Sequence, residues 1–378
     1  MKNQLVLLIS TLIITMSICG QNNGFNKTPQ HKGLGHGYEF ENNGKHTGSK
    51  KMMNVFEKDT TLHKVSISNE AGLGTAFVSN MKYLNRKGSA LASPLSALKY
   101  NYESIRNVNQ YLNNKNLDSL DVSSVELQKI WGEDSCGNVF FTSYYTPIIE
   151  VSLTQDSIYK FPIYKKPSSI HLQKLTRSQI DKKQMLKNKS LEIGYAKDYW
   201  DVYSMQVQGS GYVEFEDGTR KLYAYGGNNG KAYSSIGKHL TDLDYISKED
   251  ISMQSIRDWF DENPDSLDIL MKNASYVYFK ETNKQPRGAA NVPLVDFVSV
   301  ACDFNYLPKG ALLLGEIPVL DGEGSFLGHE YRILMVHDTG GAIKGPGHVD
   351  LYAGVGPSAG KYAGKMKHYG RLWLILPY

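Results

Sequence analysis

The sequence predicts a mainly β protein with a few helices, and three observations support this fold class. Glycine and tyrosine are abundant, with 35 and 25 residues in a chain of 378, and this composition favours turns and strands over long helices. Short apolar segments recur between glycine-rich turns, above all after residue 291. No internal repeat and no alternation of strands with helices is visible, so we expect a barrel-like β core.

The N-terminal segment is expected to be an export signal followed by a tether. Lys2 precedes a short apolar run at residues 5–19, which is too short to span a bilayer comfortably. The run ends at Cys19, which resembles a lipoprotein cleavage site where the cysteine is acylated. Ile18 departs from the small residue usual there, so a plain secretory signal is the alternative. Residues 20–60, rich in Gly, Asn, Lys and His, are expected to form a flexible tether.

The composition excludes several classes of protein. Hydrophobic residues make up 41% and charged residues 21%, with a net charge of +4, which excludes intrinsic disorder and a polytopic membrane protein. No Lys/Arg stripe with interleaved aromatics indicates nucleic acid as the main partner. Only 3 cysteines are present, so this is not a disulfide scaffold. Outside the cytoplasm Cys136 and Cys302 would be able to pair, and a buried free thiol is the alternative.

Two helices are predicted among the strands. Ser93-Pro94 opens the first, and apolar residues recur at three- and four-residue steps up to Leu112, which indicates a packing helix with one apolar face. The second covers residues 248–272, and Pro264 is expected to break it into two parts.

Strands are predicted where apolar and aromatic residues run together or alternate with polar ones. Residues 139–149 form the first such segment. Residues 204–216 alternate around a glycine, and Asp217-Gly218 then makes a hairpin turn to residues 222–225. Beyond residue 291 further strands are expected at 294–301, 311–319, 331–337 and 372–376.

The sequence contains partial matches to common catalytic and metal-binding motifs, but each match lacks a residue that the motif requires. Residues 356–360 match the G-x-S-x-G pattern, but no Asp or Glu follows Ser358, so no hydrolase triad can be completed and a helix start is the better interpretation. Residues 321–325 resemble a calcium loop, but Phe326 stands where glycine is needed, so a hairpin turn is expected. The 10 histidines show no ligand spacing, and neither a metal nor a cofactor is expected.

Three aspartates in glycine-rich settings remain as candidate catalytic residues: Asp303, Asp338 and Asp350. Asp338 follows an apolar strand and precedes Thr339-Gly340-Gly341, whose glycines allow a sharp turn and a close approach of ligand. Asp350 lies among turn residues and opens an apolar and aromatic stretch. Carboxylates at strand ends act as general acid, general base or electrostatic stabiliser in glycosidic cleavage. For each aspartate alone, a turn-forming side chain is the alternative.

A longer pattern connects these aspartates to a known family. Residues 338–345 (Asp-Thr-Gly-Gly-Ala-Ile-Lys-Gly), with Asp350 downstream, resemble the three-aspartate domain of membrane-bound lytic murein transglycosylase A. Residues 141–147 resemble that family's F-T-G-Y-Y-T-P segment, and residues 206–213 resemble its V-Q-G-S-G-Y motif. Further matches, in the same order, lie at 233–238, 252–257, 292–294 and 368–373. Two departures are Ser143 in place of the glycine and Cys302 beside the first aspartate.

The resemblance implies a fold and an activity. The fold is a double-psi β-barrel domain made from residues 61–151 and 275–378, with a second β-barrel-like domain inserted at 152–274 and a groove between the domains for a glycan strand. The activity is cleavage of the β-1,4 bond between N-acetylmuramic acid and N-acetylglucosamine in peptidoglycan, without water, leaving a 1,6-anhydro ring. The family's catalytic acid falls at Asp350, and Asp338 and Asp303 correspond to its other two acids.

A single carboxyl group can serve both steps of that reaction. Protonated Asp350 would donate to the glycosidic oxygen and then accept the proton of the sugar's own C6 hydroxyl as that oxygen attacks C1. Asp338 is expected to raise the pKa of Asp350 by like-charge repulsion while staying ionised. Lys344 would hydrogen-bond the substrate or counter the acids, with a solvated turn lysine as the alternative.

Five further residues are candidate sugar contacts: Tyr144, Tyr145, Thr146, Gln206 and Gln208. The two glutamines are expected to share one face of a strand, and amides bridge sugar hydroxyls and acetamido groups. The tyrosines would stack on pyranose faces, or else be half-buried core residues.

Two other functions stay open, a hydrolase that uses water on the same barrel and a non-catalytic glycan-binding lipoprotein. Three clustered acids argue against the second. The expected partners are peptidoglycan glycan strands, a membrane reached through a lipid anchor on Cys19, and proteins of cell-wall synthesis. The protein is expected to be a monomer at the periplasmic face of the outer membrane, the location typical of the family.

Overall fold

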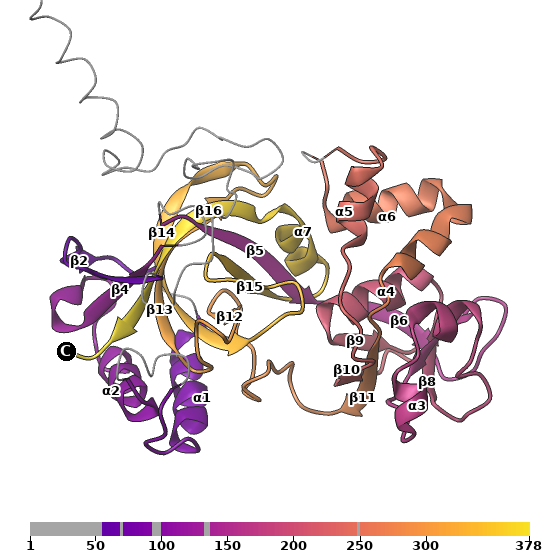
Figure 1. The fold of residues 1–378 in the computed structure, drawn as a ribbon, viewed down its shortest axis with the longest axis horizontal. Helices are drawn as coiled ribbons and strands as arrows, with labels where there is room; N and C mark the ends of the chain where they lie inside the picture. The colour runs from indigo at the N-terminus through magenta and orange to yellow at the C-terminus, as the bar shows by residue number, and fades with distance from the viewer. Residues whose placement is uncertain (1–54, 69–70, 93–99, 132–136, 248–249) are drawn as a thin grey trace, which may run out of the picture.

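The computed structural model describes residues 55–68, 71–92, 100–131, 137–247 and 250–378. Two bodies lie side by side in Figure 1, one around an eight-stranded sheet and one around a six-stranded sheet. The expectation of a mainly β fold with a few helices is therefore confirmed. In the described part of the chain, no helix has both the length and the apolar character that crossing a bilayer requires.

The eight-stranded sheet closes into a barrel. Its order is β1-β4-β16-β13-β14-β12-β15-β5, and β16 also pairs with β5, so six of the strands form a ring. The pairs β12–β14 and β15–β5 are parallel and the other pairs in the ring are antiparallel. The ring strands are β5 (Val139–Thr146), β12 (Ser299–Ala301), β13 (Leu312–Leu320), β14 (Phe326–Asp338), β15 (His348–Val355) and β16 (Lys367–Leu376).

The barrel is composite, because β5 from the first half of the chain completes a ring whose other strands come from the last 80 residues, 299–378. The first half also supplies β1 (Phe56–Asp59) and β4 (Glu126–Ile130), which extend the sheet beyond β16. The tether expected to reach residue 60 therefore ends earlier, since Val55 is buried and Phe56 begins a strand. The export signal, Cys19 and the rest of the tether lie outside the described residues.

Two helices cover one side of the barrel, α1 (Leu73–Asn85) and α2 (Tyr102–Asn113). Helix α2 begins where the side chain of Asn101 accepts a hydrogen bond from the backbone N–H of Ser104. Because Asn101 is extended, a continuous helix from Pro94 to Leu112 is wrong, and residues 93–99 lie outside the description. The apolar face is confirmed, since Ile105, Val108 and Leu112 are buried. Between α2 and β4 lie β3 (Leu120–Asp121), which pairs with β2 (Lys64–Val65), and η4 (Val122–Ser124).

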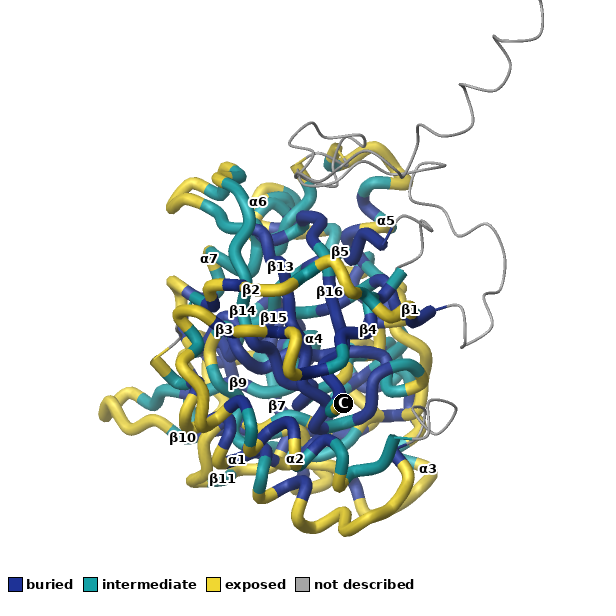
Figure 2. Tube along the Cα trace, turned by 90° about the vertical axis from the view of Figure 1, so that its left-hand side faces the viewer, coloured by how far each residue is buried: buried dark blue, intermediate teal, exposed yellow. Residues whose placement is uncertain are grey.

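The core of this body combines the barrel interior with the helix-covered side. Consecutive residues of β13, Leu312 to Leu314, are fully buried, because one face of the strand looks inward and the other is covered. Each such leucine contributes about 2 kcal/mol through burial of its side chain. Figure 2 shows these buried strands in dark blue, with exposed segments at the periphery. A rigid β frame of this kind can hold polar side chains at fixed positions along its strands.

The second body has the strand order β11-β10-β9-β6-β8-β7. Since β6 and β11 belong to this sheet, the body extends beyond the expected limits of 152–274. The hairpin at Asp217-Gly218 is confirmed, with Gly218 at φ +79° between β9 and β10. The strands are β6 (Ile148–Ser152), β7 (Phe161–Tyr164), β8 (Glu192–Ala196), β9 (Gly211–Glu214), β10 (Arg220–Asn228) and β11 (Val277–Thr282).

The strand expected at 204–216 is wrong in its first half. Residues Tyr199–Gln208 form α4, capped by the Asp198 side chain at its start and by Gly209 in the left-handed conformation at its end. This helix is buried on nearly every side, so its sequence shows no polar face and a short window of it resembles a strand. The glycine that we interpreted as an interruption ends the helix, and β9 starts only at Gly211.

Helices α5 and α6 and the segment η6 pack against α4. The predicted break at Pro264 is confirmed, because α6 (Met253–Glu262) ends just before it and a 3₁₀ segment, η6 (Pro264–Lys272), follows. Residues 248–249 lie outside the description. The remaining helical segments are α3 (Ile170–Gln173), η5 (Ser178–Lys182) and α5 (Ile236–Asp242).

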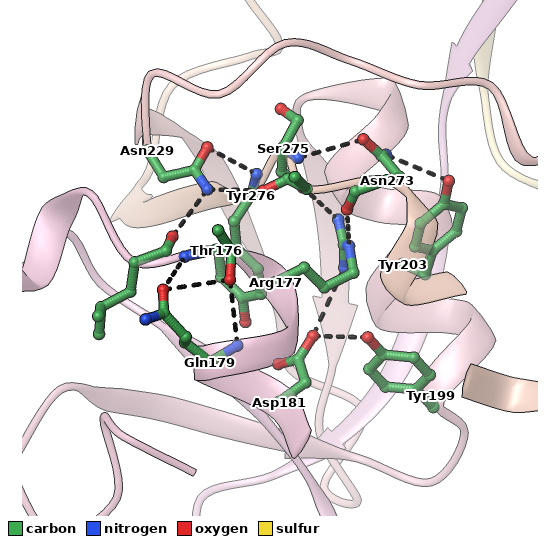
Figure 3. A network of polar contacts seen from close by, with 12 residues as sticks. Thr176, Arg177, Gln179, Asp181, Tyr199, Tyr203, Asn229, Asn273, Ser275 and Tyr276 are labelled. Carbon is green, nitrogen blue, oxygen red and sulfur yellow. Dashed lines mark hydrogen bonds and ion pairs between the residues drawn. The ribbon is translucent and has the colours of Figure 1, made fainter. Parts of the chain in front are cut away.

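A buried arginine ties this body together (Figure 3). Arg177 donates to the backbone carbonyls of Asn273 and Ser275 at 3.0 and 2.8 Å, and its Nη1 lies 3.6 Å from the carboxylate of Asp181. The rings of Tyr203 and Tyr276 lie 4.7 and 5.2 Å from the guanidinium carbon. The arginine therefore fixes the segment before β11 to η5.

The C-terminal segments follow the sequence predictions with two differences. The strands expected at 311–319, 331–337 and 372–376 correspond to β13, β14 and β16. The turn at 321–325 joins β13 to β14, and a helix, α7 (Pro357–Lys365), starts where residues 356–360 predicted one. The strand expected at 294–301 is reduced to β12, because Phe297 adopts a positive φ of 57° that interrupts an extended chain. The segment around Asp350, interpreted as a turn, is strand β15.

Candidate active site

Strand pairing brings Asp338 and Asp350 together. Asp338 is the last residue of β14 and Asp350 is the third residue of β15. Ala301 of β12, the strand between them, is in register with both aspartates. Asp303 follows two residues after Ala301. The three acids that the sequence singled out therefore meet at one place on the barrel.

Asp350 is bonded to the strand beside it. Its register partner on β5 is Thr142, whose hydroxyl donates to Oδ1 at 2.6 Å. Burial raises the pKa of Asp350 to about 7; the hydrogen bond from Thr142 opposes the rise, and the nearby charge of Asp338 adds to it. Burial, rather than the expected like-charge repulsion, is thus the main cause of the raised pKa.

Asp338 is held by three donors. Its Oδ1 accepts from the backbone N–H groups of Ala289 and Thr339, both at 2.9 Å, and its Oδ2 accepts from the phenol of Tyr144 at 3.1 Å. Burial raises the pKa of Asp338, while these bonds and the charge of Lys309 lower it. The bonds favour the carboxylate, because N–H and O–H donors stabilise negative charge.

Gly288 permits the close approach of the chain that supplies one of these donors. A Cβ at this position would lie 2.4 Å from the carbonyl oxygen of His337 and 2.9 Å from Cβ of Asp338. Any larger residue would therefore push the 288–290 segment away from Asp338 and weaken the bond from Ala289.

Asp303 has a different task from the other two acids. Its Oδ1 accepts from the backbone and side-chain nitrogens of Asn305 at 3.0 and 2.9 Å, and its Oδ2 accepts from the backbone N–H of Gly345 at 3.0 Å. The carboxylate thus secures the glycine-rich loop between β14 and β15. Cys302 beside it is a buried thiol, and Cys136 lies outside the described residues.

The aromatic residues predicted to contact sugar occupy two settings. Tyr144 lies beside Asp338, to which its phenol donates, with its ring centroid 5.2 Å from that of Tyr352. Tyr145 contacts the second body through its backbone N–H, which donates to Oε1 of Gln208 at 3.0 Å. Its ring lies against α7 of the first body, where a Cβ on Gly360 would come within 2.9 Å of it. Tyr145 and Gln208 therefore join the two bodies, and in this structure they are bonded to each other.

Two of the predicted sugar contacts are buried in the structure. Thr146 is 1% exposed, and its hydroxyl is bonded to the phenol of Tyr352 at 2.8 Å, so it belongs to the core. Gln206 is 4% exposed within α4. Residues two apart on a helix do not share a face, so Gln206 and Gln208 cannot act as the pair expected on a strand.

The loop between β14 and β15 faces the second body. Lys344 is exposed on this loop. A Cβ on Gly341 would lie 3.6 Å from Cβ of Tyr233, which belongs to the second body. A further link is made by Lys367 of β16, whose Nζ donates to the carbonyl of Ile251 at 2.8 Å. The acids therefore lie on the side of the barrel that is turned toward the second body.

Sequence reasoning missed two residues next to Asp350. Thr142 stands inside the 141–147 motif, but we did not single it out. His348 shares a strand face with Asp350, and its Nε2 lies 2.9 Å from Oγ1 of Thr142. Burial lowers the pKa of His348 to about 4. His348 precedes Asp350 by two residues, and residues two apart share a face of a strand. This spacing could have indicated His348 only if residues 348–355 had been predicted as a strand.

The arrangement suits proton transfer by carboxyl groups. Burial raises the pKa of both acids, to about 7 for Asp350, whereas the three donors around Asp338 favour its carboxylate form. Among the described residues, no group of three or more His, Cys, Asp or Glu side chains is placed to hold a metal ion. Fold and site together define an enzyme class with a closed six-stranded β-barrel, an inserted β domain and an aspartate pair at their junction.

Comparison with known proteins identifies the family. The model of the MltA specific insert domain matches residues 140–280, and that of the 3D domain matches residues 298–376. Membrane-bound lytic murein transglycosylase A of Vibrio cholerae is 41% identical over 256 residues, which is 66% of this chain and 69% of that protein. The Escherichia coli K12 protein of the same name is 40% identical over 260 residues, with the same shares. The chain belongs to the membrane-bound lytic murein transglycosylase A family.

Solved structures agree with this assignment and with a double-psi barrel carrying an inserted domain. The crystal structure of E. coli MltA with bound chitohexaose matches with a TM-score of 0.72 and 31% identity, covering 93% of this chain and 99% of that chain. The membrane-bound lytic murein transglycosylase from Agrobacterium tumefaciens matches with a TM-score of 0.67 and 25% identity, covering 84% and 98%.

Proposed function

We propose that this protein is a lytic transglycosylase that cleaves the β-1,4 bond between N-acetylmuramic acid and N-acetylglucosamine in peptidoglycan and leaves a 1,6-anhydromuramic end. The observation that carries the proposal is the buried Asp350, with its pKa raised to about 7, on the barrel shared with the family. A carboxyl group with this pKa is partly protonated at neutral pH, as a general acid must be, and becomes a competent base once it has given its proton away.

Asp350 performs both proton transfers in this mechanism. Its proton goes to the glycosidic oxygen as the bond from that oxygen to C1 of the muramic acid breaks. The C6 hydroxyl oxygen of the same sugar then attacks C1, and the C6 hydroxyl proton returns to Asp350. The attack is intramolecular, which favours it over attack by water when the ring is held in place.

Asp338 is the electrostatic partner. Three donors favour its carboxylate form against the burial that raises its pKa, and in this mechanism its negative charge stabilises the oxocarbenium-like transition state at C1. Asp303 holds the loop between β14 and β15 through Gly345, so it acts on the reaction through the position of that loop. Lys344, exposed on the same loop, is proposed to contact the substrate.

The glycan strand is proposed to lie between the two bodies, next to Tyr144 and the acids. Support comes from the side of the barrel on which the acids lie and from the chitohexaose bound to the similar E. coli protein. Tyr233 of the second body, opposite Gly341, is the aromatic side chain placed to meet a sugar ring there.

The proposed location is the periplasmic face of the outer membrane. We propose that residues 1–19 direct export and that acylated Cys19 anchors the mature chain to the membrane, with residues 20–54 as the tether. The names of the relatives, which include the words membrane-bound, support an association with a membrane. We also propose that the protein is a monomer and that proteins of cell-wall synthesis are its partners.

The test is digestion of purified peptidoglycan by the chain without residues 1–19, followed by mass spectrometry of the muropeptides. We expect products lighter by one water that lack a reducible end. Asp350→Asn should abolish them, while Asp217→Asn, in the exposed turn between β9 and β10, should not. Products with reducing ends would make the protein a hydrolase, and glycan binding without any release would make it a glycan-binding lipoprotein.

A further inference from the structure

A short chain of hydrogen-bonding groups lies behind Asp350. Nε2 of His348 is 2.9 Å from Oγ1 of Thr142, and this hydroxyl is 2.6 Å from Oδ1 of Asp350. His348 and Asp350 project from the same face of β15, and Thr142 comes from the parallel neighbour β5. All three side chains are at least partly buried. The parallel pairing of two strands thus creates a contact that neither strand contains alone.

The direction of the hydrogen bonds in this chain follows from its chemistry. The threonine hydroxyl has one proton, and its 2.6 Å distance to the carboxyl oxygen is typical of an O–H group that donates to a carboxylate. The hydroxyl must then accept from His348, so the imidazole carries its proton on Nε2. Burial keeps the pKa of His348 at about 4, so the ring is neutral near pH 7 and has a single proton to place.

We propose that this chain gives the two carboxyl oxygens of Asp350 separate tasks. Oδ1 remains a hydrogen-bond acceptor from Thr142 through the whole reaction, and Oδ2 is the atom that carries the catalytic proton. Thr142 and His348 are positioning residues, because they act on the sugar only through Asp350. The inference rests on the proposed function and deepens it by naming the reacting atom.

The remaining contacts of Asp350 agree with this division. Among the described residues, no hydrogen bond to Oδ2 accompanies the one to Oδ1. Other titratable groups face the carboxyl from each neighbouring strand, namely Asp338 at the end of β14, Tyr144 on β5, Cys302 after β12 and His348 on β15. Tyr144 donates to Asp338 instead, which leaves Thr142 as the donor to Asp350.

The bond from Thr142 also limits how far burial raises the pKa of Asp350. Burial alone favours the protonated form, whereas a donor on Oδ1 stabilises the carboxylate. Without the donor, Asp350 would hold its proton more tightly and would release it to the glycosidic oxygen less readily. The hydrogen-bond chain therefore holds the pKa of Asp350 at a value that suits both the release of its proton in the first step and the uptake of a proton in the second.

The first experiment measures the pKa of Asp350 without any turnover. The carboxyl carbons of ¹³C-aspartate-labelled protein, without its export signal, are titrated by NMR and assigned with Asp350→Asn. Thr142→Val should raise the pKa of Asp350 by about one unit, and Thr142→Ser should leave it unchanged. Ser143→Ala is the matched control, because its hydroxyl donates to the Leu351 carbonyl across the same strand pair and should not affect the pKa.

His348 gives a second and independent test. Its ring packs against Phe140 with centroids 5.5 Å apart, so His348→Phe keeps an aromatic ring there and removes the donor. We expect this variant to raise the pKa of Asp350 by less than Thr142→Val does, and His348→Gln, which keeps an N–H donor, to restore it. A fall in the pKa with His348→Phe would overturn the proposal, since it would mean that Thr142 had been donating to the histidine. Detection of ¹⁵N signals typical of the Nδ1–H tautomer would overturn it as well.

The rate measurement then separates this inference from the proposed function. On peptidoglycan, the alkaline limb of the pH profile of kcat/KM should move upward by the same one unit in Thr142→Val and stay in place in Thr142→Ser. Absence of anhydro products from the unaltered protein would end the proposed function but would leave the NMR shift standing. An unchanged pKa in Thr142→Val would end this inference while anhydro products were still formed. If Thr142→Val does not fold, Thr142→Ala and His348→Phe carry the same test.

Discussion

Replacing Tyr144 by phenylalanine should move the acid limb of the pH profile. The phenol donates to Oδ2 of Asp338 at 3.1 Å, and phenylalanine keeps the ring against Tyr352 while removing this donor. A hydrogen bond to a charged group contributes roughly 1.5–3 kcal/mol. At 3.1 Å we take the lower figure, about 1.5 kcal/mol, which corresponds to about one pKa unit.

The sign of the effect follows from the protonation states that the proposed mechanism assigns to the two acids. In that mechanism the productive form has Asp338 ionised and Asp350 protonated, so we expect activity to be lost when Asp338 takes up a proton at low pH. Tyr144→Phe raises the pKa of Asp338, and the acid limb moves upward by about one unit. At a pH on that limb, kcat/KM should therefore fall about tenfold relative to the unaltered protein.

The assay is the pH dependence of kcat/KM for anhydromuropeptide release between pH 4 and pH 8. Tyr352→Phe is the matched control, because it removes a buried phenol of the same ring pair that is bonded to Thr146 and not to an acid. An acid limb that stays in place in Tyr144→Phe, or that moves equally in both variants, would refute the reasoning that Tyr144 stabilises the Asp338 carboxylate.

Three further predictions concern stability. Burial raises the pKa of Asp350 from 3.8 to about 7, so the folded state binds this proton more tightly than the unfolded state does. The bound proton therefore contributes about 4 kcal/mol to the free energy of unfolding, and this contribution is lost as the pH rises from 4 to 7. In Asp350→Asn that loss should be absent from urea midpoints measured across this range, and an unchanged pH dependence would contradict the buried-acid assignment. Arg177→Met leaves Asp181 buried without its ion-pair partner and should lower the free energy of unfolding by about 3–5 kcal/mol in urea titrations. Arg220→Met, which breaks an exposed pair with Glu214, should cost less than about 1 kcal/mol, and equal losses would argue against the buried network. Gly288→Ala places a Cβ 2.4 Å from the His337 carbonyl oxygen, so it should lower the free energy of unfolding by about 1–3 kcal/mol and should also reduce activity. Gly218→Ala in the β9–β10 turn, where a Cβ meets no atom within 4 Å, should lower stability and leave activity unchanged.

Several elements were predictable because their causes are local. Pro264 cannot continue α6, and Asp217-Gly218 has the backbone freedom that a tight hairpin needs, so both boundaries appear in the structure as predicted. The error at α4 has an equally clear cause. A helix covered on nearly every side has no polar face, so hydrophobic periodicity cannot distinguish it from a strand, and the glutamines at 206 and 208 were placed on a common face that does not exist.

The three aspartates were identifiable from their glycine-rich surroundings and from motifs that recur in the family, because such short patterns are written in consecutive residues. Their separate roles depend on contacts between distant segments. Thr142 meets Asp350, 208 residues further along the chain, only because β5 closes the barrel beside β15. Burial sets the pKa of Asp350, Gly288 allows Ala289 to reach Asp338, and Asp303 holds a loop, all through packing that no local pattern encodes. The tertiary structure alone therefore sets the pKa of Asp350, since a carboxyl pKa is governed by desolvation and by donors that arrive with the fold.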